Sequence, residues 1–193
     1  MKRPISYYLI NSLTWYRFIM GPVLIILAVS GYYDFFKWLL PFSYATDLVD
    51  GFLARKYRVA TTDGAKMDSY GDDITVAASI VGLFVFKIDF IIEHWIILVL
   101  LLALFALQTL LAFKTYKRMT SYHTYLAKLA AILQGTFFIL LFLLEFPMMS
   151  LFYAACYVTM LELIEEIILV KVIKQWRTNV KGLYWVLKEQ RKK

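Results

Sequence analysis

The chain has 193 residues, of which 61% are hydrophobic and 18% aromatic, and its mean hydropathy is +0.65. This composition excludes an ordinary soluble domain and indicates that the solvent of the folded chain is lipid. The formal net charge is +7, but the cations cluster at the ends of apolar segments, so we expect anionic lipid headgroups rather than nucleic acid as partners.

Apolar segments long enough to cross a hydrocarbon core of about 30 Å, which takes about 20 helical residues, recur along the chain. We predict an all-α, polytopic membrane protein with one domain over residues 1–193 and six transmembrane helices. The predicted helices cover residues 11–31, 35–55, 64–86, 95–113, 125–146 and 150–172. We interpret the first as a helix rather than a cleaved signal peptide, because further spans follow it.

Lysine and arginine gather at the N-terminus, in the second and fourth connections and at the C-terminus, whereas the other connections hold only Lys37 and Lys87. By the positive-inside rule both termini are expected in the cytoplasm, which requires an even number of spans. The basic tail, residues 173–193, mixes Trp176 and Trp185 with cations. An interfacial amphipathic helix and a disordered basic tail are equally compatible with it.

Four aspartates interrupt the second and third apolar segments. Asp47 and Asp50 are three residues apart, and Asp68 and Asp72 are four apart, so each pair lies on one face of its helix. Counted from the basic connection at 1.5 Å per residue, Asp47 lies about 13 Å deep and Asp72 about 12 Å deep. Since a short connection favours antiparallel neighbours, the two pairs are predicted to converge.

Converging carboxylates in a partly dehydrated cavity cannot all ionise without compensation. Mg²⁺ or Mn²⁺ would provide it, because these hard cations take carboxylate and phosphate oxygens, and the sequence has no cysteine–histidine cluster for zinc. The alternative is buried ion pairs with Arg17, Arg55 or Lys66.

The aspartates fall in one continuous pattern, Asp47-x2-Asp50-Gly51-x2-Ala54-Arg55-x8-Gly64-x3-Asp68-x3-Asp72. It resembles the signature of the CDP-alcohol phosphatidyltransferases, with every fixed position and both gap lengths kept. The resemblance implies that a CDP-linked lipid, typically CDP-diacylglycerol, donates its phosphatidyl group to a polar alcohol and that CMP leaves.

The resemblance also implies roles for single residues. Asp47, Asp50 and Asp68 would bind two metal ions, with Asp72 shared between metal and substrate and acting as the general base. The CDP pocket would be lined by Gly51, Ala54, Arg55 and Gly64, with Thr14 a weaker candidate. The site would face the cytoplasm at the cell membrane, and a homodimer is possible.

The alcohol is less defined than the donor. Family members that use glycerol 3-phosphate usually have proline and lysine where this chain has Ser69 and Asp73. We take glycerol 3-phosphate as the first candidate for the acceptor, with serine, inositol or inositol phosphate as alternatives. Lys128 and Arg118 are candidates for binding a phosphate on the alcohol, although they could equally be ordinary positive-inside residues.

Three further acids, Glu162, Glu165 and Glu166, lie in the last predicted span. A functional role and simple pairing with Lys128 or Lys171 are equally compatible with them. Two other functions remain open at this stage: a cation transporter or channel in which the four aspartates form an ion path, and a non-catalytic membrane scaffold.

Overall fold

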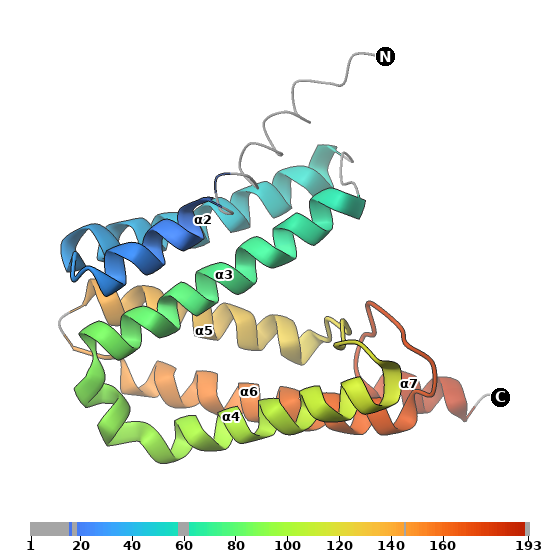
Figure 1. Cartoon of the computed structure of the whole chain (residues 1–193). Helices are drawn as coiled ribbons and strands as arrows, with labels where there is room; N and C mark the ends of the chain where they lie inside the picture. The colour runs from blue at the N-terminus through green and yellow to red at the C-terminus, as the bar shows by residue number, and fades with distance from the viewer. Residues whose placement is uncertain (1–15, 17–18, 58–61, 145, 192–193) are drawn as a thin grey trace, which may run out of the picture. The chain divides into compact units, whose positions relative to one another are not determined.

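The computed structural model describes residues 16, 19–57, 62–144 and 146–191, with only the backbone described for 47–57, 62–70, 72 and 73. The described residues form helices and no strand; one isolated bridge joins Ser121 and Thr178. The chain divides into two compact units, residues 1–92 and 93–193, and Figure 1 shows the helices of each.

The N-terminal unit contains an apolar helix, Ile19–Val29, followed by α2 (Tyr33–Tyr57) and α3 (Thr62–Phe86). Gly31 has a φ of +78° in the turn before α2, a conformation that glycine adopts without steric cost. The helices α2 and α3 lie side by side in Figure 1. Where α2 begins, Tyr33 and Phe36 pack on Phe86 at the end of α3, with ring centroids 5.1 and 5.5 Å apart.

The C-terminal unit contains most of α4 (Ile88–Tyr116), together with α5 (Tyr125–Leu143), α6 (Met149–Val172) and α7 (Leu183–Gln190). Non-helical dihedrals at His94 kink α4 near its start. The Thr124 side chain caps α5 by accepting a hydrogen bond from the Ala127 N–H at 3.1 Å. Gln134 of α5 donates to Thr159 of α6 at 2.7 Å, so the two helices are joined by a polar bond as well as by apolar packing.

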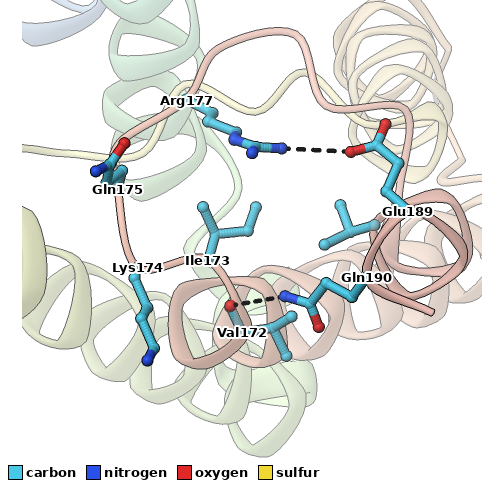
Figure 2. A pocket seen from close by; sticks show the side chains of 8 residues that line it. Val172, Ile173, Lys174, Gln175, Arg177, Glu189 and Gln190 are labelled. Atoms are coloured by element: carbon cyan, nitrogen blue, oxygen red, sulfur yellow. Dashed lines mark hydrogen bonds and ion pairs between the residues drawn. The ribbon is translucent and has the colours of Figure 1, made fainter. Parts of the chain in front are cut away.

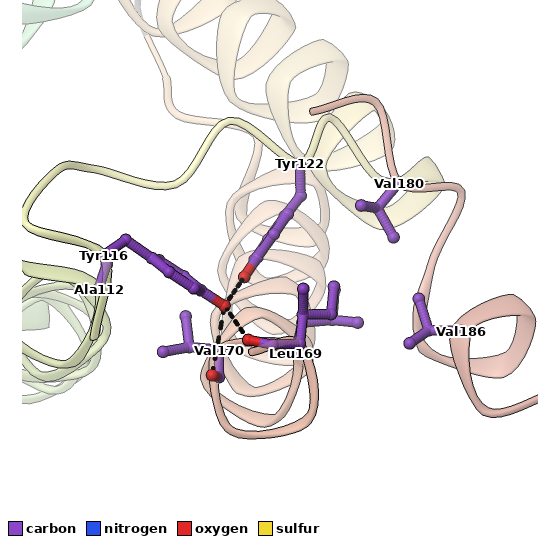
Figure 3. Close-up of a cluster of buried hydrophobic side chains, with 8 residues drawn as sticks. Ala112, Tyr116, Tyr122, Leu169, Val170, Val180 and Val186 are labelled. Carbon is purple, nitrogen blue, oxygen red and sulfur yellow. Dashed lines mark hydrogen bonds between the residues drawn. The ribbon is translucent and has the colours of Figure 1, made fainter. Parts of the chain in front are cut away.

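A buried cluster joins α4, α6, α7 and the segments between them (Figure 3). At its centre the Tyr116 hydroxyl donates to the Ile173 carbonyl at 2.6 Å and lies 2.8 Å from the Tyr122 hydroxyl. Burial, and then the bond to Tyr116, raises the pKa of Tyr122 above its ordinary value. Around the two rings lie Ala112, Leu169, Val170, Ile173, Val180 and Val186.

Two described helices, α4 and α5, are long and apolar enough to cross a membrane. Only 11% of the most apolar stretch of α4 and 28% of that of α5 is buried, whereas the core helix of a soluble protein would be mostly buried. Shorter apolar helices cover Ile19–Val29 and Ile74–Phe86. The prediction of an all-helical, membrane-embedded chain is therefore confirmed, while six spans and cytoplasmic termini stay predictions.

The observed helices agree with the predicted segments to within about three residues wherever the structure describes them, except that α4 begins at Ile88, seven residues before the predicted start, with the kink at His94 between the two positions. The tail differs in detail, because residues 174–182 are not helical and only α7 forms a helix there. The tail is therefore neither a continuous amphipathic helix nor entirely without helix.

Candidate active site

The helices α2 and α3 carry the aspartate motif on their backbones. Asp47 and Asp50 lie in the last part of α2, and Asp68 and Asp72 lie in the first part of α3. The structure describes only the backbone of these four residues and of Gly51, Ala54, Arg55 and Gly64. Thr14 lies outside the described residues. The site is therefore built from the backbone and from its described neighbours.

Contacts between α2 and α3 fix how the two helices are aligned. Beyond the packing of Tyr33 and Phe36 on Phe86, the hydroxyl of Tyr44 lies 3.0 Å from that of Ser79. Residues with higher numbers on α2 thus contact residues with lower numbers on α3. The helices are antiparallel, as the short connection between them predicts.

The same alignment places the aspartate positions. From Tyr44, Asp47 and Asp50 lie about 5 and 9 Å farther along α2, at 1.5 Å per residue. From Ser79, Asp72 lies about 10 Å and Asp68 about 16 Å back along α3. Asp72 therefore lies within about 2 Å of the level of Asp50, while Asp47 lies about one turn farther from the connection and Asp68 about one turn closer to it.

Buried hydroxyls line α2 and α3 next to the motif. Ser43 and Thr46 on α2, and Thr75 and Ser79 on α3, are each at least nine-tenths buried. The Thr75 hydroxyl donates to the Gly71 carbonyl at 2.9 Å, and Ser79 donates to the Thr75 carbonyl at 3.0 Å. These bonds satisfy Thr75 and Ser79 within their own helix, so these two residues add no unpaired donor where α2 and α3 approach.

A close contact with the first helix also lies beside the motif. A Cβ on Gly21 would overlap Ile74 Cγ2 and lie 3.0 Å from Ile74 Cβ. Ile74 follows Asp72 by two residues, so Gly21 allows the helix Ile19–Val29 to pack directly against α3 beside the motif. Gly21 and the buried hydroxyls do not stand out in the sequence, because a small residue in an apolar segment has no distinctive pattern.

The two acceptor candidates, Lys128 and Arg118, lie in the C-terminal unit against aromatic rings. The Lys128 ammonium is 5.8 Å from the centroid of Tyr125, and the Arg118 guanidinium is 4.9 Å from the ring centre of Trp176. Both cations thus have aromatic neighbours at the ends of α4 and α5.

Two of the acids on α6 have structural partners. Glu166, which is 8% exposed, accepts hydrogen bonds from Gln108 at 2.6 Å and Thr120 at 2.8 Å. Glu165 accepts a bond from the Leu183 N–H at 2.9 Å and so caps the first turn of α7. The described contacts of these two carboxylates are with amide, hydroxyl and backbone donors rather than with Lys128 or Lys171.

A cavity of about 260 Å³ lies where α6 ends and α7 packs back (Figure 2). Arg177 lies 3.4 Å from Glu189 across it, and Gln190 donates to the Val172 carbonyl at 3.2 Å. These bonds hold α7 to the end of α6. Its described lining residues belong to the end of α6, to α7 and to the segment between them.

The described side chains contain no group of three or more histidine, cysteine, aspartate or glutamate residues that could hold a metal ion. The four motif aspartates are not among those side chains. The fit to a metal rests on their donor chemistry and backbone alignment, since four aspartates within about three turns of two neighbouring helices offer the oxygen ligands that Mg²⁺ and Mn²⁺ take.

Comparison with known proteins identifies the motif independently of the structure. The model of one family, described as CDP-alcohol phosphatidyltransferase, matches residues 7–165, which is most of the chain and includes the entire motif. No curated protein and no solved structure matches the chain.

Proposed function

Because the chain belongs to the CDP-alcohol phosphatidyltransferase family, we propose that it transfers the phosphatidyl group of CDP-diacylglycerol to a polar alcohol at the α2–α3 site. The observation that carries this proposal is the antiparallel alignment of α2 and α3, which brings the position of Asp72 level with Asp50 and within about one turn of Asp47. An ion path would not account for the family match, and a non-catalytic scaffold that kept the motif is distinguished from the transferase by the activity assay below.

Four carboxylates would hold the metal ions. Asp47, Asp50, Asp68 and Asp72 fit two Mg²⁺ or Mn²⁺ ions by donor type. When bound, such ions neutralise the diphosphate charge and polarise the phosphorus under attack.

Asp72 is proposed as the general base. Its carboxylate takes the proton of the acceptor hydroxyl as the oxygen bonds to the phosphatidyl phosphorus, and the bond from that phosphorus to CMP breaks. Asp72 is the α3 aspartate nearest the level of Asp50 and Asp47, so this position suits contact with both metal and substrate.

The donor nucleotide is proposed to lie along the same two helices. Gly51, Ala54 and Gly64 are small enough for the diphosphate and ribose to approach the backbone, and Arg55 supplies a cation for the phosphates. Thr14 contributes a hydroxyl to the nucleotide from the first segment. These assignments follow the family motif position by position.

Glycerol 3-phosphate is the proposed acceptor, with Lys128 and Arg118 binding its phosphate. Serine, inositol and inositol phosphate are the alternatives, since Ser69 and Asp73 differ from the usual pattern of enzymes that use glycerol 3-phosphate. The proposed setting is the cell membrane, with six spans and the site on the cytoplasmic side, and a homodimer is the proposed assembly.

The acceptor is identified by testing a panel of alcohols separately. The purified full-length chain in detergent is given CDP-diacylglycerol labelled in the phosphatidyl group, Mg²⁺ or Mn²⁺, and one alcohol at a time. Glycerol 3-phosphate is expected to give a labelled phosphatidyl product and an equal amount of CMP. Product from serine or inositol alone would reassign the acceptor, and no product or CMP with any alcohol would overturn the transferase proposal.

A further inference from the structure

The helix α7 presents an outward face that combines apolar and cationic side chains. Its inward side chains are Val186, which is 4% exposed, and the partly buried Leu183, and both pack on the cluster around Tyr116. Tyr184 points away from them and is 65% exposed, and Leu187, at the edge between the two faces, is 40% exposed.

Helical spacing adds two cations to this outward face. Tyr184, Leu187, Lys188 and Arg191 are three, four and seven residues apart, so they project from one side of the helix. Lys188 and Arg191 are exposed, and the Lys188 ammonium lies 5.8 Å from the Tyr184 ring centroid. Figure 3 shows Val186 turned toward the buried cluster, on the other side of α7.

The contacts of α7 with α5 indicate where α7 lies relative to the membrane boundary. Trp185 packs on Tyr125, the first residue of α5, with ring centroids 5.3 Å apart, and on Tyr184 at 5.5 Å. Since α5 is long and apolar enough to cross a membrane, its first residue marks the boundary between hydrocarbon and headgroups. Tyrosine and tryptophan are enriched at that boundary.

The charge of the segment is strongly positive. Residues 174–191 contain five cations and one carboxylate, and that carboxylate, Glu189, is paired with Arg177. The cations are Lys174, Arg177, Lys181, Lys188 and Arg191. A protein partner is not indicated by any described contact, whereas basic side chains around exposed aromatic rings complement an anionic lipid surface.

We propose that the outward face of α7 is a recognition surface for anionic phospholipid headgroups, with Tyr184 and Leu187 inserted at the boundary and Lys188 and Arg191 contacting lipid phosphates. Bonds at both ends hold α7 in place for this role: the Leu183 N–H donates to Glu165, and Gln190 donates to the Val172 carbonyl. The proposal is independent of the transfer reaction, because it involves neither the aspartates nor the acceptor candidates.

The test uses the full-length chain in lipid nanodiscs. Cys156→Ala removes the single cysteine, and Leu187→Cys carries a nitroxide whose accessibility to oxygen and to a water-soluble nickel chelate is measured by electron paramagnetic resonance. Discs of phosphatidylcholine are compared with discs that also contain phosphatidylglycerol. We expect a higher ratio of oxygen to nickel accessibility in the anionic discs.

Charge variants complete the test. Lys188→Gln and Arg191→Gln are tested separately. Each is expected to lower the ratio of immersed to water-exposed label in anionic discs about fivefold, because each removes the attraction of one cation to the anionic surface. Lys87→Gln removes a charge immediately before α4, at the other end of that helix, and should leave the ratio unchanged. A label at Tyr184→Cys should behave in the same way if the Leu187 variant does not fold.

Three outcomes would overturn the proposal. The label could be open to nickel in anionic discs, which would place α7 in water. It could be immersed equally in neutral and anionic discs, which would remove the lipid selectivity. It could be shielded from both reagents, which would indicate that a second copy of the chain or another protein covers α7.

Discussion

Asp72 is the residue on which the proposed chemistry depends most. We expect Asp72→Asn to reduce CMP release from CDP-diacylglycerol by about a thousandfold or more, because the amide can neither take the acceptor proton nor provide a negative ligand. The variant should remain folded and bind CDP. Initial rates of CMP release, with CDP binding measured by calorimetry, check this prediction.

Asp89→Asn is the matched control, since Asp89 is exposed in the first turn of α4 and lies outside the motif. Its activity should equal that of the unmodified chain. Full activity in Asp72→Asn would disprove the assigned role of Asp72, and an equal loss in both variants would point to a general effect of lost charge.

The sequence predicts which residues carry charge at the proposed site but not which residues pack around it. Asp47, Asp50, Asp68 and Asp72 could be found because acids in apolar segments are costly and their spacing is specific. Gly21, Thr75 and Ser79 could not, because their roles depend on which neighbour lies within contact distance.

The first helix packs against α3 through a contact that tolerates no side chain at position 21. Gly21→Ala is expected to lower the free energy of unfolding by about 1–3 kcal/mol, because the new Cβ overlaps the branched Ile74 side chain. Since Ile74 is two residues from Asp72, activity should fall as well. Thermal unfolding in detergent and CMP release measure the two effects.

A double-mutant cycle separates this contact from other effects of each substitution. Ile74→Ala removes the overlapping Cγ2, so Gly21→Ala should cost less stability in that background than in the unmodified chain. Additive losses would show that Gly21 and Ile74 do not interact as described.

The Tyr116 hydroxyl joins the end of α4 to the end of α6 and to Tyr122. Tyr116→Phe is expected to lower stability by about 1–2 kcal/mol, because the buried Ile173 carbonyl and the Tyr122 hydroxyl lose their partner while the ring volume is kept. The thermal midpoint of the full chain checks this. Tyr157→Phe, at a position that is 61% exposed, is the control and should change little.

At the scale of single helices the sequence predicted most segments well, because long apolar segments bounded by polar residues have a strong signal. It predicted the C-terminal segment less well. The break at residues 174–182 and the docking of α7 depend on Val186 reaching the cluster around Tyr116 and on Glu165 capping Leu183, and both contacts join residues distant in the sequence.

For the whole molecule, an apolar, helical chain carries one acidic motif whose two halves align on neighbouring antiparallel helices. Its family membership shows the class of reaction, and the exposed apolar surfaces of α4 and α5 indicate a membrane setting. The central claim that joins these observations is that the aspartate carboxylates act through divalent metal ions on the diphosphate of the donor.

Metal dependence of transfer tests this claim most directly. The purified chain is stripped with a chelator and given CDP-diacylglycerol with the acceptor from the panel, and CMP release is followed as Mg²⁺ or Mn²⁺ is added back. The account predicts no turnover in the stripped protein and recovery of the full rate with added metal. An undiminished rate in the presence of excess chelator would contradict it.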